Sequence, residues 1–403
     1  MKYLIVTYSD YKNLHGQNIR SFYYIQELIK RGHEVHLIVS RGANINEVSE
    51  LFKKKIKIHK FFISTPRFTR FKMIRYSLFM FLADKYVEKV VRRINPDIIF
   101  AQNLLPGYPA SKAAKKYNIP FVYDVFDFYH EMLLLKFGLS EDNIFFKILK
   151  NIEIGTMERA KLIVTVSDTF KKNIENLTKK KERKKKEVEV VYEGADITLF
   201  KPQEPNKRLL MKYNLKKKKV ITFLGGIEKF DGLDILIDAA KTLSGEFNNA
   251  VFMIIGTGSY LPNIQQKIKE CGLETYFIFT GWVNFNEVPS FLSVSDICVI
   301  TLIKSHITDS VLTTKFYEFL ASEKAVVIPN LSGFREIAVD NKNSLLFKCE
   351  DSASLAEAIR KLLNDDSLIK KLGKNGRTLI LNEYSIQKLS KKLADITDRI
   401  IGV

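Results

Sequence analysis

The stretch KVITFLGGIEKFDGLDILIDAA, residues 219–240, joins a short β-branched run to a longer amphipathic segment. A short apolar run favours a buried strand, and apolar residues at helical spacing favour a helix. The same alternation recurs along the chain, where the other β-branched runs are KYLIVT (2–7), HEVHLIV (33–39), PDIIFA (96–101), IPFVYDV (119–125), AKLIVTVS (160–167), AVFMIIG (250–256), YFIFTG (276–281), DICVIT (296–301) and KAVVIPN (324–330). Strands separated by helices predict an α/β fold with parallel sheets.

The chain length indicates two domains, because 403 residues exceed what one hydrophobic core usually serves. The segment FKPQEPNKRLLMKYNLKKKK, 200–219, combines Pro202, Pro205 and a lysine run, and is the best linker candidate. We therefore expect an N-terminal Rossmann-like domain at 1–205 and a C-terminal one at 206–385. The last segment, 386–403, has apolar residues at helical spacing and could pack back on the first domain.

Doubly wound domains bind ligands at the carboxyl ends of their strands. Two such domains facing each other across a cleft would place two binding crevices opposite one another. That arrangement suits the transfer of a group between two substrates, with the acceptor on the N-terminal domain.

Composition narrows the class of protein. Hydrophobic residues make up 46% and charged residues 27%, which argues against disorder. Three cysteines without a C-x-x-C spacing indicate neither a zinc site nor a disulfide framework. The N-terminus becomes polar too early for a signal peptide, and no apolar run reaches the ~18 residues of a spanning helix, so we expect a cytoplasmic protein.

The formal charge of +19 favours an anionic partner, namely a nucleotide, a lipid head group or a nucleic acid. Alternatively, a lysine-rich composition can be shared by most proteins of an organism and then indicates no particular partner. The stretch PRFTRFKMIRYSLFMFLADKYVEKV, 66–90, interleaves basic and aromatic residues, which is typical of an anionic membrane surface or of an ordinary surface helix. The run TKKKERKKKE, 178–187, is expected to be a solvated loop.

The segment SHITDSVLTTKFYEFLASEKAVVI, 305–328, carries the main candidate site. A helix start offers unpaired N–H groups and the positive end of the helix dipole, where phosphate oxygens fit. Thr313, Thr314 and Lys315 would hold phosphates. Glu318, one turn further in, could accept hydrogen bonds from two ribose hydroxyls; alternatively, it is a solvated helical glutamate.

Several motifs together resemble the retaining GT-B glycosyltransferases of family 4. The matching segments, in chain order, are HGQNIRSFYYIQELIKRGHEVHLIV (15–39), FLGGIEKFDGLDILIDAA (223–240), IIGTGSY (254–260), FTGWVNFNEVPSFLSVSDICVI (279–300), TTKFYEFLASEKAVVIPNLSGFREI (313–337) and NEY (382–384). The resemblance covers nearly the whole chain. It implies a sugar-nucleotide-dependent transferase that retains the anomeric configuration and needs no metal or other cofactor.

The resemblance also implies roles for individual residues. Glu318 matches the glutamate that binds the nucleotide ribose. Gly225, Gly226 and Gly256 match glycines where the backbone approaches the donor diphosphate, and a purely structural turn is the alternative. Gly16, in the first loop, would approach the diphosphate and the sugar.

Three positions depart from the family pattern. Where the family often has a second glutamate, seven intervening residues before the ribose glutamate, this chain has Ser310, with Asp309 beside it. An arginine and a lysine that usually hold the diphosphate are replaced by Gly226 and Asp231. We expect Lys229 and Lys315 to substitute for that pair, because they lie in the two candidate phosphate loops.

In the first domain, a histidine found near the donor sugar in some members is replaced by Phe126, leaving Asp124, Asp127, His130 and Glu131 nearby. Asp127 could contact a sugar hydroxyl or the acceptor once the domains close; alternatively, Asp124 and Asp127 cap the following helix.

The expected function is therefore transfer of a sugar from a nucleoside-diphosphate sugar to a lipid-linked saccharide or polysaccharide, with Asp127, Lys229 and Glu318 as catalytic residues. The rival hypotheses are a catalytically silent nucleotide-sugar binder and a protein that binds polyanions or a membrane surface. We expect no nucleic-acid partner, and a location in the cytoplasm or at the membrane periphery.

Overall fold

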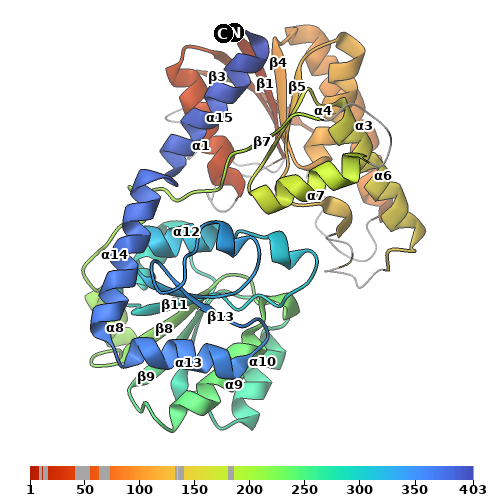
Figure 1. The fold of residues 1–403 in the computed structure, drawn as a ribbon. Coiled ribbons are helices and arrows are strands. Elements are labelled where there is room, and N and C mark those ends of the chain that lie inside the picture. Colours follow the sequence, from red (N-terminus) through yellow and green to blue (C-terminus); the bar gives the residue numbers. More distant parts are fainter. Residues whose placement is uncertain are drawn as a thin grey trace. The chain divides into compact units, whose positions relative to one another are not determined.

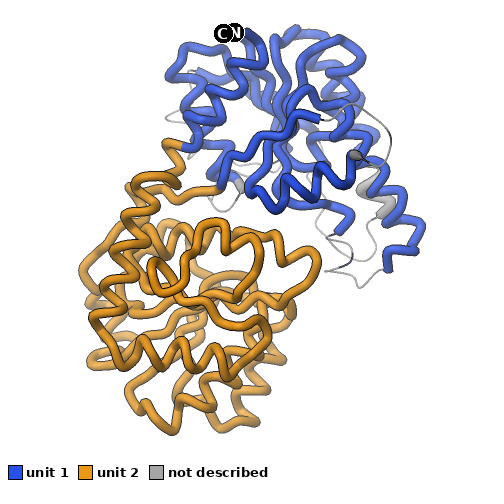
Figure 2. Tube along the Cα trace, viewed as in Figure 1, with its two compact units in different colours: residues 1–192, 389–403 blue, residues 193–388 orange. Residues whose placement is uncertain are grey.

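The computed structural model describes residues 1–8, 11, 17–40, 55–62, 73–131, 134, 140–179 and 186–402. The chain divides into two compact units, of which the first comprises Met1–Tyr192 with Leu389–Val403 and the second Glu193–Lys388 (Figure 2). The division after Tyr192 precedes the proline-containing segment from which the sequence placed a boundary at residue 205. That segment belongs to the second unit, where Asn206 caps a short helix by accepting hydrogen bonds from Arg208 N and Leu209 N.

The first unit contains a seven-stranded parallel sheet in the order β3-β2-β1-β4-β5-β6-β7. Its strands are β1 (Lys2–Val6), β2 (Glu34–Ser40), β3 (Ile56–Phe61), β4 (Ile98–Gln102), β5 (Phe121–Asp124), β6 (Leu162–Thr165) and β7 (Val188–Val190). Its helices are α1 (Gln17–Lys30), α3 (Met73–Ile94), α4 (Leu104–Tyr117), α6 (Ile144–Arg159), α7 (Asp168–Lys179) and most of α15 (Ile386–Ile401) (Figure 1).

The second unit contains a six-stranded parallel sheet in the order β10-β9-β8-β11-β12-β13. Its strands are β8 (Lys219–Leu224), β9 (Ala250–Ile255), β10 (Phe277–Gly281), β11 (Ile297–Val299), β12 (Ala325–Pro329) and β13 (Leu345–Phe347). Its helices are α8 (Lys207–Lys212), α9 (Leu233–Ser244), α10 (Leu261–Glu270), α11 (Val288–Ser293), α12 (Thr314–Ala321), α13 (Ser352–Leu363) and α14 (Asp366–Asn382). Both sheets confirm the predicted pair of doubly wound, Rossmann-like folds.

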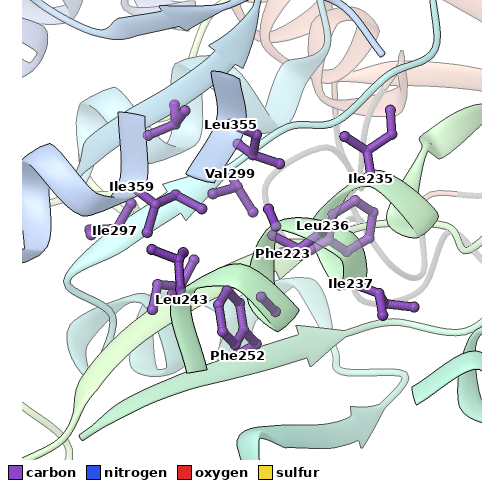
Figure 3. Close-up of a cluster of buried hydrophobic side chains, with 14 of the residues drawn as sticks. Phe223, Ile235, Leu236, Ile237, Leu243, Phe252, Ile297, Val299, Leu355 and Ile359 are labelled. Atoms are coloured by element: carbon purple, nitrogen blue, oxygen red, sulfur yellow. The ribbon is translucent and has the colours of Figure 1, made fainter. Parts of the chain in front are cut away.

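Successive strand residues supply cores on both faces of the second sheet. Ile221 and Phe223 of β8 pack with helices α9 and α13, and Figure 3 shows side chains from the sheet and from both helices gathered in this core. Val220, which precedes Ile221 and so points to the opposite face, belongs to a separate cluster with Val251 and Met253. This alternation follows from the two-residue period of a strand, and it explains why the β-branched runs are apolar throughout.

The last helix, α15, is bound to the first unit by hydrogen bonds from three of that unit's side chains. Tyr24 donates to Thr397 Oγ1 at 2.9 Å, and Arg31 donates to Asp395 Oδ1 at 2.7 Å and to Asp398 Oδ2 at 2.8 Å. The Tyr3 hydroxyl also donates to Asp398. The terminal segment thus completes the layer of helices on the first sheet.

Candidate functional site

Two glycine loops meet at the carboxyl edge of the second sheet. Gly225 follows β8 with a φ of 143°, and Gly256 follows the neighbouring β9 with a φ of 139°. A Cβ at Gly256 would lie only 1.9 Å from the carbonyl oxygen of Gly225. Both the backbone conformation and the close approach therefore require glycine at position 256.

Replacing Gly256 by alanine is expected to destabilise the second unit by about 2–3 kcal/mol, because the new methyl group overlaps backbone that has no room to move. Urea unfolding measures this loss. Gly245→Ala is the matched control, since Gly245 has a negative φ and a Cβ there meets nothing within 4 Å. Equal stability of the two variants would contradict the steric argument.

The loop after Gly226 is fixed by its own acidic residues. Glu228 and Asp231 form a capping box around the 3-10 turn Lys229–Asp231. Glu228 also accepts a hydrogen bond from the Ser259 backbone N–H at 3.2 Å, and the Asp231 carbonyl accepts one from the Thr301 hydroxyl at 2.6 Å. The first glycine loop is thereby tied to the loops that follow β9 and β11.

Helix α12 points its N-terminus at the same edge, because it returns the chain from the carboxyl end of β11 to the start of β12. Thr313 is its N-cap residue, but the Thr313 hydroxyl makes no capping hydrogen bond. The Thr313 Oγ1 atom is buried and has no hydrogen-bond partner. A buried hydroxyl without a partner at a helix N-terminus is a feature that an anionic ligand would satisfy.

Lys315 extends from the first turn of α12 to the glycine loop. Its Nζ lies 3.8 Å from Asp231 Oδ1 and 4.7 Å from the centroid of the Phe223 ring. A Cβ on Gly225 would lie 2.8 Å from the same nitrogen. Burial lowers the pKa of the Lys315 ammonium, while the carboxylates of Asp231 and Glu318 act in the opposite direction.

Glu318 is buried on the second turn of α12, with 6% of its surface exposed. Burial raises the pKa of its carboxyl group to about 8; Lys315 opposes this rise and Glu193 adds to it. Burial also raises the pKa of Asp231, against the influence of Lys315. Two carboxyl groups with raised pKa values, Asp231 on the glycine loop and Glu318 on α12, therefore both act on the Lys315 ammonium, a pattern common at functional sites.

The other candidates of this unit lie on the same two loops. Thr314 is the first residue of α12, and Gly226 is exposed directly after Gly225. Lys229 is exposed at the start of the 3-10 turn, whereas Lys315 is largely buried. The two lysines proposed to replace the family's basic pair therefore differ in their environments.

Asp309, beside the serine that replaces the family's second glutamate, is engaged in holding another loop. Its carboxylate accepts hydrogen bonds from Ser332 N at 3.1 Å and from Ser332 Oγ at 2.7 Å, and its carbonyl accepts one from Gly333 N at 2.8 Å. Burial alone would raise the pKa of Asp309, but the hydrogen bonds from Ser332 outweigh it and lower the pKa. The Ser310 hydroxyl donates to Ile307 O.

In the first unit, Asp124 is held by a residue that sequence reasoning missed. Arg20 forms a two-pronged pair with the buried Asp124 carboxylate, with Nε–Oδ2 and Nη2–Oδ1 distances of 3.0 Å each. Arg20 Nη1 also donates to Val191 O and Tyr192 O. The Asp124 carboxylate thus accepts hydrogen bonds from the side chains of Arg20 and Gln102.

The turn that carries Asp127 is braced on both sides. Asn103 Oδ1 accepts from Phe126 N at 3.2 Å, and the buried Glu153 accepts from Tyr129 N at 3.0 Å and from His130 N at 3.2 Å. The Nδ1 atom of His130 lies 2.6 Å from Glu153 Oε2. Asp127 itself is half-buried. Gly16 lies outside the described residues, as do all of residues 66–72.

No group of three or more metal-ligating side chains occurs among the described residues. Within the same part of the chain, no helix is both long and apolar enough to cross a bilayer.

Comparison with known proteins identifies the family of the chain. The family described as Glycosyltransferase Family 4 matches residues 15–199, and the family described as Glycosyl transferases group 1 matches residues 207–379. The chain belongs to the group 1 glycosyltransferases of the GT-B fold.

Individual relatives agree with this assignment. An uncharacterized glycosyltransferase of Methanocaldococcus jannaschii is 24% identical over 61% of this chain and 60% of its own length. A GDP-mannose-dependent alpha-(1-6)-phosphatidylinositol monomannoside mannosyltransferase of Mycobacterium tuberculosis is 26% identical over 52% of this chain and 55% of its own. The chain thus spans little more than half the length of these two curated relatives.

Solved structures show the same fold over the whole chain. Sucrose-phosphate synthase from Thermosynechococcus elongatus superposes with a TM-score of 0.79 at 14% identity, covering 99% of this chain and 98% of that one. Anabaena HepE, in complex with UDP-glucose, gives 0.77 at 17% identity, covering 99% and 100%. At these identities, the likeness establishes the GT-B fold alone.

Proposed function

We propose that the protein transfers a sugar from a nucleoside-diphosphate sugar to a saccharide acceptor, and that the second unit binds the donor. The observation that carries this proposal is the cluster of Thr313, Lys315 and Glu318 at the start of α12, from which Lys315 reaches the Gly225 loop. It combines a helix N-terminus, a buried ammonium and a buried carboxyl group within two turns of one helix. The family assignment agrees with a nucleotide-sugar donor.

In this proposal, Glu318 accepts hydrogen bonds from the ribose hydroxyls, while the Thr313 hydroxyl and the first N–H groups of α12 bind the diphosphate. Negative charge grows on the diphosphate as the bond between the sugar and the phosphate oxygen breaks. Donors and cations that are already in place stabilise that charge without reorganisation. Lys315 is the buried cation of the site, and the exposed Lys229 would add a weaker contact.

The first unit would supply the acceptor site, with Asp127 on its braced turn. We propose retention at the anomeric carbon and a reaction without a metal, as the resemblance to family 4 implies. A lipid-linked saccharide is the favoured acceptor class. In its support, a relative from Mycobacterium tuberculosis is named as a mannosyltransferase acting on a phosphatidylinositol monomannoside.

The experiment is a thermal-shift panel of UDP, GDP, ADP and their sugars, measured on the full chain and on Glu318→Gln. Ligand at 100 times its Kd stabilises the folded state by about 2.7 kcal/mol, which is enough for a shift of several degrees. We expect one nucleotide class to raise the Tm, and Glu318→Gln to reduce that rise. Glu270→Gln, at an exposed position on α10, is the control. No shift with any nucleotide would refute the proposal.

Lys315→Met is expected to weaken binding of the nucleotide sugar by roughly 10- to 100-fold, because a charge-assisted hydrogen bond contributes about 1.5–3 kcal/mol. Lys229→Met should change the affinity by no more than about 3-fold, since exposed ion pairs contribute little. Isothermal titration calorimetry measures both. Equal losses in the two variants would show that burial does not distinguish these lysines.

A second candidate function is a nucleotide-sugar binder that does not catalyse transfer. Ser310 favours it, because this position lacks the carboxylate that the family often has there. Turnover of the bound donor separates the two functions. Release of free nucleotide at a rate that depends on added acceptor would support the transferase, and binding without turnover would support the silent binder.

A further inference from the structure

The N-terminal part of helix α6 exposes three large apolar side chains. The exposed fractions are 62% for Ile144, 49% for Phe145 and 48% for Ile148. Phe146, between them, is buried. Single exposed apolar residues are common on protein surfaces, but three within five positions of one helix mark an interaction surface.

This part of α6 is well defined. Asn143 caps the helix by accepting a hydrogen bond from Phe145 N at 2.9 Å. The opposite face of α6 is anchored in the unit by Phe146, Ile154 and Met157, which are buried. Helices α4 and α7 pack beside it (Figure 1). The three apolar side chains therefore project from a fixed helix.

Charge indicates the kind of partner. The first unit contains 39 lysines and arginines against 22 aspartates and glutamates, a formal charge of +17. The second unit contains 25 against 23, a formal charge of +2. Nearly all of the chain's positive charge thus belongs to the unit that carries the apolar surface. Beside the apolar side chains, the exposed Lys147 lies 3.3 Å from the exposed Asp142, and Lys150 Nζ lies 5.4 Å from the centroid of the Phe146 ring. The positive charge is therefore a property of the unit as a whole rather than of α6.

We propose that the α6 surface, formed by Ile144, Phe145 and Ile148, docks the first unit on an anionic lipid surface. The apolar side chains would enter the boundary between head groups and acyl chains, while the basic unit is attracted to anionic head groups. This location differs from the stretch 66–90 that the sequence suggested for the same kind of partner. Within that stretch, Phe79 is buried and Phe81 is 60% exposed.

A second copy of the chain fits this surface less well. Three partly exposed side chains offer on the order of a few hundred Å². A stable protein interface buries about 800 Å² on each partner. Two copies of the first unit, each with a formal charge of +17, would also repel each other. An anionic bilayer attracts the unit and requires no complementary surface shape.

The test is sedimentation of the full chain with vesicles of phosphatidylglycerol and phosphatidylcholine, compared with phosphatidylcholine alone. We expect binding to the anionic vesicles that weakens with salt. The variant Ile144→Gln/Phe145→Gln/Ile148→Gln should need about tenfold more lipid for half-maximal binding. The control Met211→Gln/Val339→Gln/Leu381→Gln changes three exposed apolar residues of the second unit and should bind as the wild type does.

Three results would overturn the proposal: no binding of the wild type to anionic vesicles, undiminished binding of the α6 variant, or a wild-type dimer in light scattering that the α6 variant abolishes. The last result would assign the surface to a second copy. Because neither donor nor acceptor enters this assay, its failure would leave the nucleotide-sugar proposal intact. Nucleotide binding by the α6 variant, measured by thermal shift, verifies that the variant is folded.

Discussion

Glu318→Gln is expected to weaken binding of the nucleoside-diphosphate sugar by about 100-fold at pH 8.5, and to remove most of the pH dependence of binding below pH 8. The glutamine keeps one oxygen acceptor but loses the charge that strengthens both ribose hydrogen bonds, each contributing about 1.5–3 kcal/mol. Calorimetric titration between pH 6 and pH 9 measures the effect. Glu270→Gln, titrated in parallel, should match the wild type.

The pH dependence of the wild type follows from the raised pKa of Glu318. With a pKa of about 8, the free protein holds this carboxyl group protonated at pH 6, and binding through the carboxylate must release the proton. The affinity should therefore rise about tenfold per pH unit below pH 8 and then level off. Because burial lowers the pKa of Lys315, the affinity should fall again on the alkaline side. Nucleotide sugars suit this experiment, since their diphosphate does not titrate in this range.

Glu318→Gln weakens ligand binding, but it should raise the stability of the folded state at alkaline pH. A carboxyl group whose pKa rises from 4.5 to about 8 on folding favours the folded state below pH 4.5, and this contribution is lost as the pH rises to 8. Glu318→Gln should thus equal the wild type in stability near pH 4.5 and exceed it by a few kcal/mol above pH 8. A variant that binds poorly while being more stable cannot owe its weak binding to unfolding. Lower stability at pH 8.5 would contradict the burial of Glu318.

Arg20→Ala is expected to destabilise the first unit by about 3–5 kcal/mol. The substitution removes both hydrogen bonds to the Asp124 carboxylate and leaves a charge in a site with no exposed surface. Breaking one side of a buried ion pair has a cost of this size. It also frees the carbonyl groups of Val191 and Tyr192. Urea unfolding, followed by a probe in the first unit, measures the loss.

Two controls separate this pair from ordinary surface charges. Arg399→Ala removes an exposed ion pair to Glu189, and should cost less than about 1 kcal/mol. Arg20→Met/Asp124→Leu removes both members of the buried pair, and should recover part of the stability lost in Arg20→Ala because no lone charge remains. Equal destabilisation by the double and single variants would show that the hydrogen bonds of the pair, rather than the stranded charge, account for the effect.

Much of the fold is readable from the sequence, because central strands of parallel sheets are buried on both faces and read as continuous apolar runs. Nine of the ten runs identified in the sequence correspond to inner strands such as β1, β8 and β9, and the tenth, YFIFTG, corresponds to the edge strand β10. The runs omit β3, β7 and β13, all of which lie at sheet edges. In β3, Lys57 and Lys60 face solvent, and β13 has only three residues, so neither forms a long apolar run.

The candidate donor site was partly predictable for the same reason. Gly225, Gly256 and Glu318 occupy positions whose backbone or helix placement follows from local sequence. The partners were not predictable, because they come from distant parts of the chain. Asp231 approaches Lys315 across 84 positions, and Arg20 approaches Asp124 across 104. Nothing in the local pattern around Arg20 distinguishes it from an exposed helical arginine.

Hydrogen–deuterium exchange of the full chain, with and without the nucleotide sugar that gives the largest thermal shift, tests the donor site most directly. The account predicts slower exchange at residues 225–232 and 313–318, and loss of this protection in Glu318→Gln at the same ligand concentration. Binding that protects neither segment, or protection that persists unchanged in Glu318→Gln, would contradict the assignment of the donor site to α12 and the glycine loop.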